Sequence, residues 1–216
     1  AAHGRPCFHR AGTMLAAGSL AADDMAQRQH DRQDPAAPTI WTVGHSTLEW
    51  EAFLELLRAH GIGAIADVRR YPGSRRYPWF ASDALARALP QAGIGYRWLP
   101  PLGGRRAPRP DSPNAAWRNA GFRGYADHMA STEFGEGLAA ALELAATQRT
   151  ALMCAEAVWW RCHRRLLSDL LQHRGWQVLH ILDAGPAQPH PGNPDARPAG
   201  DGRVYPALQG GLFPEG

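Results

Sequence analysis

The feature of this sequence that most limits its fold is a regular alternation of short apolar runs with amphipathic runs, starting near Thr39. The apolar runs predict strands at 39–43, 62–68, 96–99, 150–154 and 176–182. The amphipathic runs predict helices between Ser46 and Gly61 and over about 82–91, 131–148 and 161–174. Strands that alternate with helices form a mostly parallel sheet. We therefore predict an α/β fold: a single domain with about five mostly parallel strands and helices on both faces.

The first helix carries a sequence signal at each end. Ser46-Thr47-Leu48-Glu49 has the pattern of a capping box, in which a serine side chain and a glutamate side chain satisfy backbone N–H groups at the helix start. Gly61 supplies the residue type that most often ends a helix. The Pro and Gly content rises past Gly185, where we expect regular structure to stop.

Length and composition suit one hydrophobic core. A chain of 216 residues with 44% hydrophobic residues can bury enough apolar surface to fold as one domain. We expect residues 1–38 to be a mobile leader, 39–185 the α/β catalytic domain, and 186–216 a Pro/Gly-rich extension packed on that domain.

Cellular location is inferred from cysteine usage and apolar run length. Three cysteines form no disulfide framework, which is typical of a reduced compartment. No apolar run approaches the roughly 20 residues that span a bilayer. We expect a cytoplasmic protein without a membrane partner.

The modest net charge of +3 hides a strong local asymmetry. Residues 69–123 hold eleven arginines against two aspartates, a local charge of +9, and eight of the chain's 19 aromatic residues. Guanidinium groups interleaved with aromatic rings can hold phosphates and stack unpaired bases. The same groups can also pack on one another over a polar surface, and both interpretations remain open.

Three polar clusters follow predicted strands, at 44–46, 67–76 and 154–165. Ligands of an open parallel sheet gather at the carboxyl ends of its strands, so these clusters predict a common site. Asp67 and Glu156 are the candidate catalytic carboxylates, and His45 is a candidate acid, base or base-edge contact. Two carboxylates near arginines can activate water and stabilise positive charge on a sugar ring, as glycosidic cleavage requires. Asp67 can instead simply pair with Arg69.

Cys154, Cys162 and His163 permit two other interpretations. Their spacing matches no standard zinc module, and adjacent Cys and His side chains seldom face one ion, so we expect no metal and no cofactor. A thiolate near Arg161, Arg164 and Arg165 would have a depressed pKa and could be nucleophilic, whereas Cys154 could instead be a small buried residue that ends a strand.

Several ordered motifs resemble those of the domain-of-unknown-function family 488. The likeness covers about residues 39–216, and it rests on Thr42-Val43-Gly44-His45-Ser46, Asp67-Val68-Arg69, Pro72-Gly73-Ser74-Arg75-Arg76, Leu102-Gly103-Gly104, Trp117-Arg118-Asn119, Phe122-Arg123-Gly124-Tyr125-Ala126, Met153-Cys154-Ala155-Glu156 and Cys162-His163-Arg164. The resemblance implies a compact bacterial α/β domain in which these motifs converge. Asp-Val-Arg and the later cysteine loop are also similar, more weakly, to rhodanese-like domains.

These observations favour a nucleic-acid-processing enzyme, a DNA N-glycosylase that excises a modified base such as 5-hydroxymethyluracil. The alternatives are a rhodanese-like thiol-dependent sulfur or phosphoryl transferase and a non-catalytic nucleic-acid- or nucleotide-binding protein. The residues expected to bind substrate are Gly44, Ser46, Arg69, Arg70, Pro72, Ser74, Arg75, Arg76, Trp117, Arg118, Phe122, Arg123, Tyr125, Cys154, Cys162, His163 and Arg164.

Overall fold

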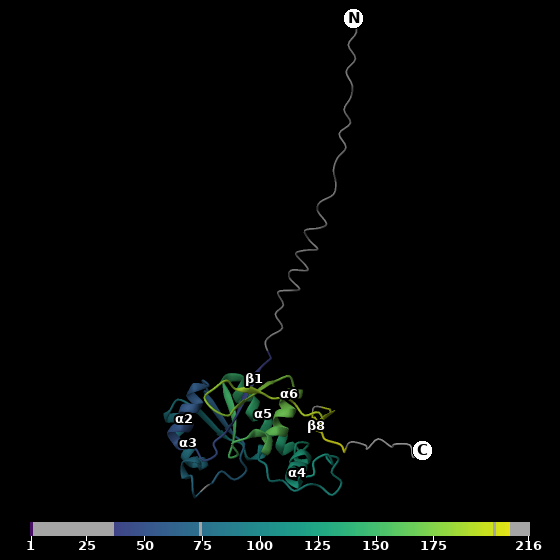
Figure 1. Ribbon diagram of the computed structural model, residues 1–216, viewed down its shortest axis with the longest axis horizontal. Helices are drawn as coiled ribbons and strands as arrows, with labels where there is room; N and C mark the ends of the chain where they lie inside the picture. The colour runs from purple at the N-terminus through teal and green to yellow at the C-terminus, as the bar shows by residue number, and fades with distance from the viewer. Residues whose placement is uncertain (2–36, 74, 201, 208–216) are drawn as a thin grey trace, which may run out of the picture. The chain divides into compact units, whose positions relative to one another are not determined.

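The computed structural model describes residues 1, 37–73, 75–200 and 202–207 (Figure 1). Nearly all of the predicted leader, and Ser74 of the predicted site, lie outside these residues. No helix of the described residues is both long and apolar enough to cross a membrane.

The centre of the domain is a six-stranded sheet with the order β3-β2-β4-β1-β5-β6. Its first five strands run parallel to their neighbours, and only β6 is antiparallel to β5. The strands of this sheet are β1 (Thr39–Gly44), β2 (Ala64–Asp67), β3 (Gly95–Trp98), β4 (Thr150–Cys154), β5 (Gln177–Ile181) and β6 (Gln188–Pro189). A separate two-stranded sheet pairs β7 (Arg197–Ala199) with β8 (Gly202–Val204). The prediction of an α/β fold with a mostly parallel sheet is confirmed.

Helices cover both faces of the sheet because its central strands bury alternate residues in opposite directions. In β1, Trp41 and Val43 belong to one hydrophobic cluster and Ile40 to the other. Figure 1 shows α2 and α3 beside one face and α5 and α6 beside the other. The helices are α2 (Trp50–Ala59), α3 (Ser82–Gln91), α4 (Ala120–His128), α5 (Thr132–Thr147) and α6 (Arg164–His173).

The predicted capping box before α2 is wrong. The helix begins at Trp50, its N-cap is Glu49, and no side chain caps it. Ser46 instead has a positive φ of 48°, and its N–H donates to the carbonyl of Ala155 at 2.9 Å. The serine therefore joins β1 to the loop after β4. The predicted end is confirmed, since Gly61 has a φ of 60° just after the helix.

The structure contains a helix that was not predicted, and short strands past Gly185, where regular structure was expected to stop. Helix α4 begins after Asn119, whose side chain accepts a hydrogen bond from the Phe122 N–H. This helix was missed from the sequence because its glycines lower helix propensity. Gly124 is nevertheless required there, since a Cβ would lie 2.2 Å from the Arg106 carbonyl oxygen. Past Gly185, β6 to β8 are too short to show a period of two.

Candidate functional site

The polar clusters meet because β1, β2 and β4 are neighbours in the sheet. Gly44 at the end of β1 lies opposite Cys154 at the end of β4, and Asp67 at the end of β2 lies opposite Met153. The three loops that follow these strands therefore leave the sheet at the same edge, where ligands of parallel sheets bind.

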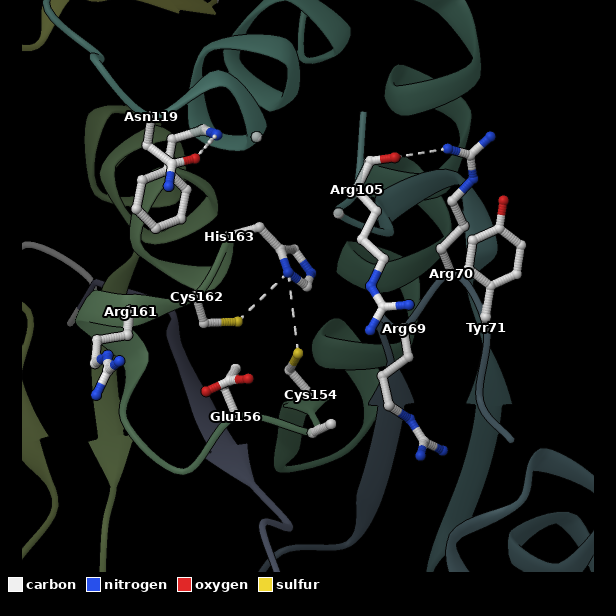
Figure 2. A pocket seen from close by; sticks show the side chains of 14 residues that line it. Arg69, Arg70, Tyr71, Arg105, Asn119, Cys154, Glu156, Arg161, Cys162 and His163 are labelled. Carbon is white, nitrogen blue, oxygen red and sulfur yellow. Dashed lines mark hydrogen bonds between the residues drawn. The ribbon is translucent and has the colours of Figure 1, made fainter. Parts of the chain in front are cut away.

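A pocket of about 320 Å³ lies at this edge (Figure 2). This volume is within the usual range for small-molecule sites. The pocket is lined by Arg69, Arg70, Tyr71, Gly104, Arg105, Asn119, Gly121, Phe122, Cys154, Ala155, Glu156, Arg161, Cys162 and His163.

Asp67 is fully buried and uses both carboxylate oxygens to hold Arg69. Arg69 Nε donates to Oδ1 at 2.8 Å, and Nη2 donates to Oδ2 at 2.5 Å. The Tyr96 hydroxyl also donates to Oδ2, at 2.8 Å. Burial lowers the pKa of Arg69, but the bonds and charge of Asp67 outweigh that effect and leave the pKa raised. Asp67 therefore fixes the side chain of Arg69, a residue of the pocket wall, and does not itself line the pocket.

His45 holds the same guanidinium from the other side. Its Nε2 accepts from Arg69 Nη1 at 3.0 Å, and its Nδ1 donates to the Ser46 carbonyl at 3.0 Å. The ring stacks on Phe80 at a centroid distance of 4.0 Å. Burial and the charge of Arg69 lower the pKa of His45 to about 4. The imidazole is therefore neutral near pH 7, and both of its nitrogens have partners within the protein.

Glu156 is exposed on the pocket wall, and its backbone is tightly held. The fully buried guanidinium of Arg164 donates to the carbonyl oxygens of Glu156 and Ala157. Gly44 packs against the same carbonyl, since a Cβ there would be only 1.9 Å from the Glu156 carbonyl oxygen. Close packing against Gly44 thus fixes the backbone position from which the Glu156 side chain extends.

Four arginines give the pocket a cationic lining. They are contributed by the loop after β2, the loop before α4 and the segment before α6, and are Arg69, Arg70, Arg105 and Arg161. Arg70 Nη1 donates to the Arg105 carbonyl at 2.9 Å, which links two of these loops (Figure 2).

Two aromatic rings and one amide complete the wall. Tyr71 is 63% exposed, and Phe122 packs edge-on against Trp117 at 5.1 Å. Because Asn119 Oδ1 caps α4, its amide N–H groups remain for a ligand. The pocket therefore offers ring surfaces, hydrogen-bond donors and positive charge.

Two thiols converge on the ring of His163 at the base of the pocket. The Nδ1 of His163 lies 3.4 Å from the Cys162 sulfur and 3.9 Å from the Cys154 sulfur. Burial raises the pKa of Cys162, but a hydrogen bond from Cys154 and the charge of Arg164 outweigh it and lower that pKa to about 6. The same hydrogen bond between the two thiols, together with burial, raises the pKa of Cys154 to about 12.

The structure brings seven of the predicted site residues to the pocket wall: Arg69, Arg70, Phe122, Cys154, Glu156, Cys162 and His163. Six more stand behind the wall and support it: Gly44, His45, Ser46, Asp67, Tyr125 and Arg164. Another five predicted residues neither line the pocket nor are seen to support its wall, and these are Pro72, Arg75, Arg76, Arg118 and Arg123. Trp117 also lies outside it, packed between Phe122 and Tyr205.

Sequence reasoning did not single out four polar or aromatic residues of the wall as site residues, namely Tyr71, Arg105, Asn119 and Arg161. Asn119 carried a usable signal, because an asparagine N-cap before α4 would have placed that helix start at the pocket. Tyr71 and Arg105 lie in loops and Arg161 ends a three-residue 3-10 helix, so no periodicity shows which way their side chains point.

The fold and the site together define a class: a parallel α/β domain with a cationic, aromatic pocket at the carboxyl edge of its sheet. Comparison with family models is more specific. Residues 49–171 match the model of DUF488, a domain of unknown function, and the chain belongs to that family. No curated protein matches the chain, and no solved structure matches it.

Proposed function

We propose that this protein is a DNA N-glycosylase, which removes a modified base by hydrolysing the bond between the base and its deoxyribose. The observation that carries this proposal is the chemistry of the wall. Among the described residues that line the pocket, Glu156 is the one carboxylate, and it shares the wall with four arginines and the rings of Tyr71 and Phe122.

The size of the pocket favours a single extruded base as the ligand. At about 320 Å³ it suits a small molecule and cannot admit a duplex. Enzymes that act on a base within DNA solve this problem by flipping the nucleotide out of the stack. The rings of Tyr71 and Phe122 offer surfaces on which a flipped base can stack.

Each charged group then has a role in the cleavage. The C1′–N bond breaks, and its electron pair leaves with the base, whose negative charge the arginines of the pocket stabilise. A water molecule adds to C1′ and gives its proton to Glu156. That proton then passes to the base anion, which leaves a neutral free base, an abasic site and an ionised Glu156. Glu156 also stabilises the positive charge that develops on the sugar. Asp67 and His45 are positioning residues, because both act by holding Arg69.

The decisive experiment compares Glu156→Gln with wild type on duplexes that carry modified pyrimidines, beginning with 5-hydroxymethyluracil. Alkali cleaves the strand at each abasic site, so excision appears as strand breaks. Loss of a general base typically costs about 10²–10⁴-fold in rate, and we expect a loss in that range. Glu55→Gln makes the same chemical change at an exposed position of α2 and is the matched control.

Excision that is unchanged in Glu156→Gln, or no strand break with any modified base, contradicts the proposal. Binding that weakens steeply with salt but yields no product would indicate the non-catalytic nucleic-acid-binding alternative.

A thiol-dependent transferase is the second candidate, because the pKa of Cys162 is lowered to about 6 in the same pocket. This candidate predicts rapid alkylation of Cys162 near neutral pH and complete loss of turnover in Cys162→Ser. Slow alkylation with retained turnover would eliminate it.

A further inference from the structure

The mechanism proposed above leaves the thiol pair at the base of the pocket without a role. Cys154 ends β4, and Cys162 and His163 immediately precede α6. Their ligating atoms all lie within 4.8 Å of one another, and both cysteines are buried and free. We propose that Cys154, Cys162 and His163 bind a zinc ion, independently of the function proposed for the pocket.

The spacing of the three donor atoms fits tetrahedral zinc. With zinc–sulfur bonds of about 2.3 Å and a zinc–nitrogen bond of about 2.0–2.1 Å, a sulfur and a nitrogen ligand stand about 3.6 Å apart. The two sulfur–Nδ1 distances, 3.4 and 3.9 Å, lie on either side of that value. Small side-chain adjustments would therefore bring all three atoms onto one ion.

The ring of His163 is oriented as a metal ligand would be. Its Nε2 donates to the Val68 carbonyl at 3.0 Å, which directs Nδ1 toward the sulfurs. Histidine ligands commonly donate their second nitrogen to a backbone carbonyl in this way. The Tyr125 ring packs edge-on against the imidazole at 5.0 Å, and a Cβ at Gly104 would lie 2.9 Å from Nδ1. The ring is thus fixed on two sides.

Hydrogen bonds from Cys154 to Cys162 and from Cys162 to Nδ1 of His163 join the three groups in a chain. A ring nitrogen offers one in-plane direction for a hydrogen bond, so it serves one sulfur well and not two. Figure 2 shows both sulfurs turned toward the same nitrogen. An ion among the three atoms satisfies all of them at once. The sequence argument against a metal was that adjacent Cys and His side chains seldom face one point, and here Cys162 and His163 do.

Ligand chemistry selects zinc among common ions. Thiolate and imidazole ligands suit zinc, whereas calcium and magnesium take oxygen ligands. Two thiolates also neutralise a divalent cation, which allows it to sit near Arg69 and Arg105. All three ligands lie on the pocket wall, so the fourth position is open to water or to a substrate atom, the arrangement of catalytic zinc sites.

The test measures metal content of the full chain produced in zinc-supplemented medium and desalted. We expect about one equivalent of zinc in wild type, and a fall to near zero in Cys154→Ser and Cys162→Ser. Cys7 lies outside the described residues, and Cys7→Ser is the matched control that should retain the zinc.

A spectroscopic test does not depend on the variants folding. Wild type stripped with a chelator and titrated with Co²⁺ should develop thiolate-to-cobalt charge transfer and the visible bands of a tetrahedral ion, saturating near one equivalent. A wild-type protein without zinc and without these bands overturns the proposal. So does equal loss of zinc in Cys7→Ser, or a Cys154–Cys162 disulfide that forms in air in the presence of zinc. These results are independent of strand cleavage, and stoichiometric zinc would exclude free Cys162 as the nucleophile of the transferase alternative.

Discussion

Replacing Asp67 with asparagine should destabilise the domain strongly, because it would leave the charge of Arg69 buried without its partner. The side chains of Asp67 and Arg69 are 0% and 8% exposed. Asp67 accepts four hydrogen bonds: three from the backbone N–H, Nε and Nη2 of Arg69, and one from the Tyr96 hydroxyl. Asparagine keeps one oxygen and turns an NH₂ group toward a donor, so it loses the charge and at least one of these bonds.

The expected cost is about 3–5 kcal/mol, the range found when one partner of a buried ion pair is removed. With a urea m-value of about 2.5 kcal/mol/M, the unfolding midpoint should fall by about 1.5 M. Tyr96→Phe removes one bond to the charged carboxylate and should cost about 1.5–3 kcal/mol.

A double-mutant cycle separates the ion pair from general damage to the core. Arg69→Met alone should also be costly, since it leaves the Asp67 carboxylate buried. Asp67→Asn combined with Arg69→Met should cost less than the sum of the single changes by about 2 kcal/mol or more, because neither charge is then left alone. Single variants that each cost less than about 1 kcal/mol, or costs that add without coupling, would refute this reasoning.

Two further predictions concern the site loop and the pH dependence of stability. Gly44→Ala places a Cβ 1.9 Å from the Glu156 carbonyl oxygen, so it should cost about 1–3 kcal/mol in urea unfolding and reduce base excision, whereas Gly135→Ala, with open space around its Cβ, should do neither. Burial and neighbouring charges lower the pKa of His45 to about 4 and that of His180 to about 3. The unfolded chain therefore binds more protons below about pH 6.5, and stability should fall as the pH drops through that value, by about 2 kcal/mol per histidine at pH 5. Urea midpoints at pH 7 and pH 5 measure this loss, which His180→Gln should roughly halve; an unchanged midpoint between the two pH values would contradict it.

The strand and helix order was predictable because this sheet is buried on both faces. A short continuous apolar run such as 150–154 is typical of a strand that is buried on both faces. That strand is confirmed with the predicted bounds. Helix α3 is confirmed with the predicted bounds as well. The start of α2 was missed because Ser46 has two possible uses. The capping pattern involves only neighbouring residues. In the structure the N–H of Ser46 donates instead to the carbonyl of Ala155, which is more than a hundred residues away in the chain.

The position of the pocket could be predicted from the sequence, but the roles of its individual residues could be predicted less well. Chain order indicated that the loops after β1, β2 and β4 would share one edge, because parallel strands end together. Which carboxylate faces the pocket depended on side-chain direction at the ends of two strands. Asp67 is the last residue of β2 and is buried, whereas Glu156 lies two residues beyond β4 and is exposed.

The arginine-rich segment 69–123 serves two purposes, and only the structure separates them. Arg87, Arg97, Arg106 and Arg109 form ion pairs with carboxylates that do not line the pocket. These exposed or partly exposed pairs contribute little to stability. The pairs with Glu133 and Glu143, which lie outside the segment, leave less free charge than the count of +9 indicates. Arg69, Arg70 and Arg105 line the pocket, and Arg161, from outside the segment, joins them. The positive charge that acts on a ligand is therefore concentrated at the pocket, so substitutions of these four arginines should weaken binding of an anionic ligand more than substitutions of the paired ones.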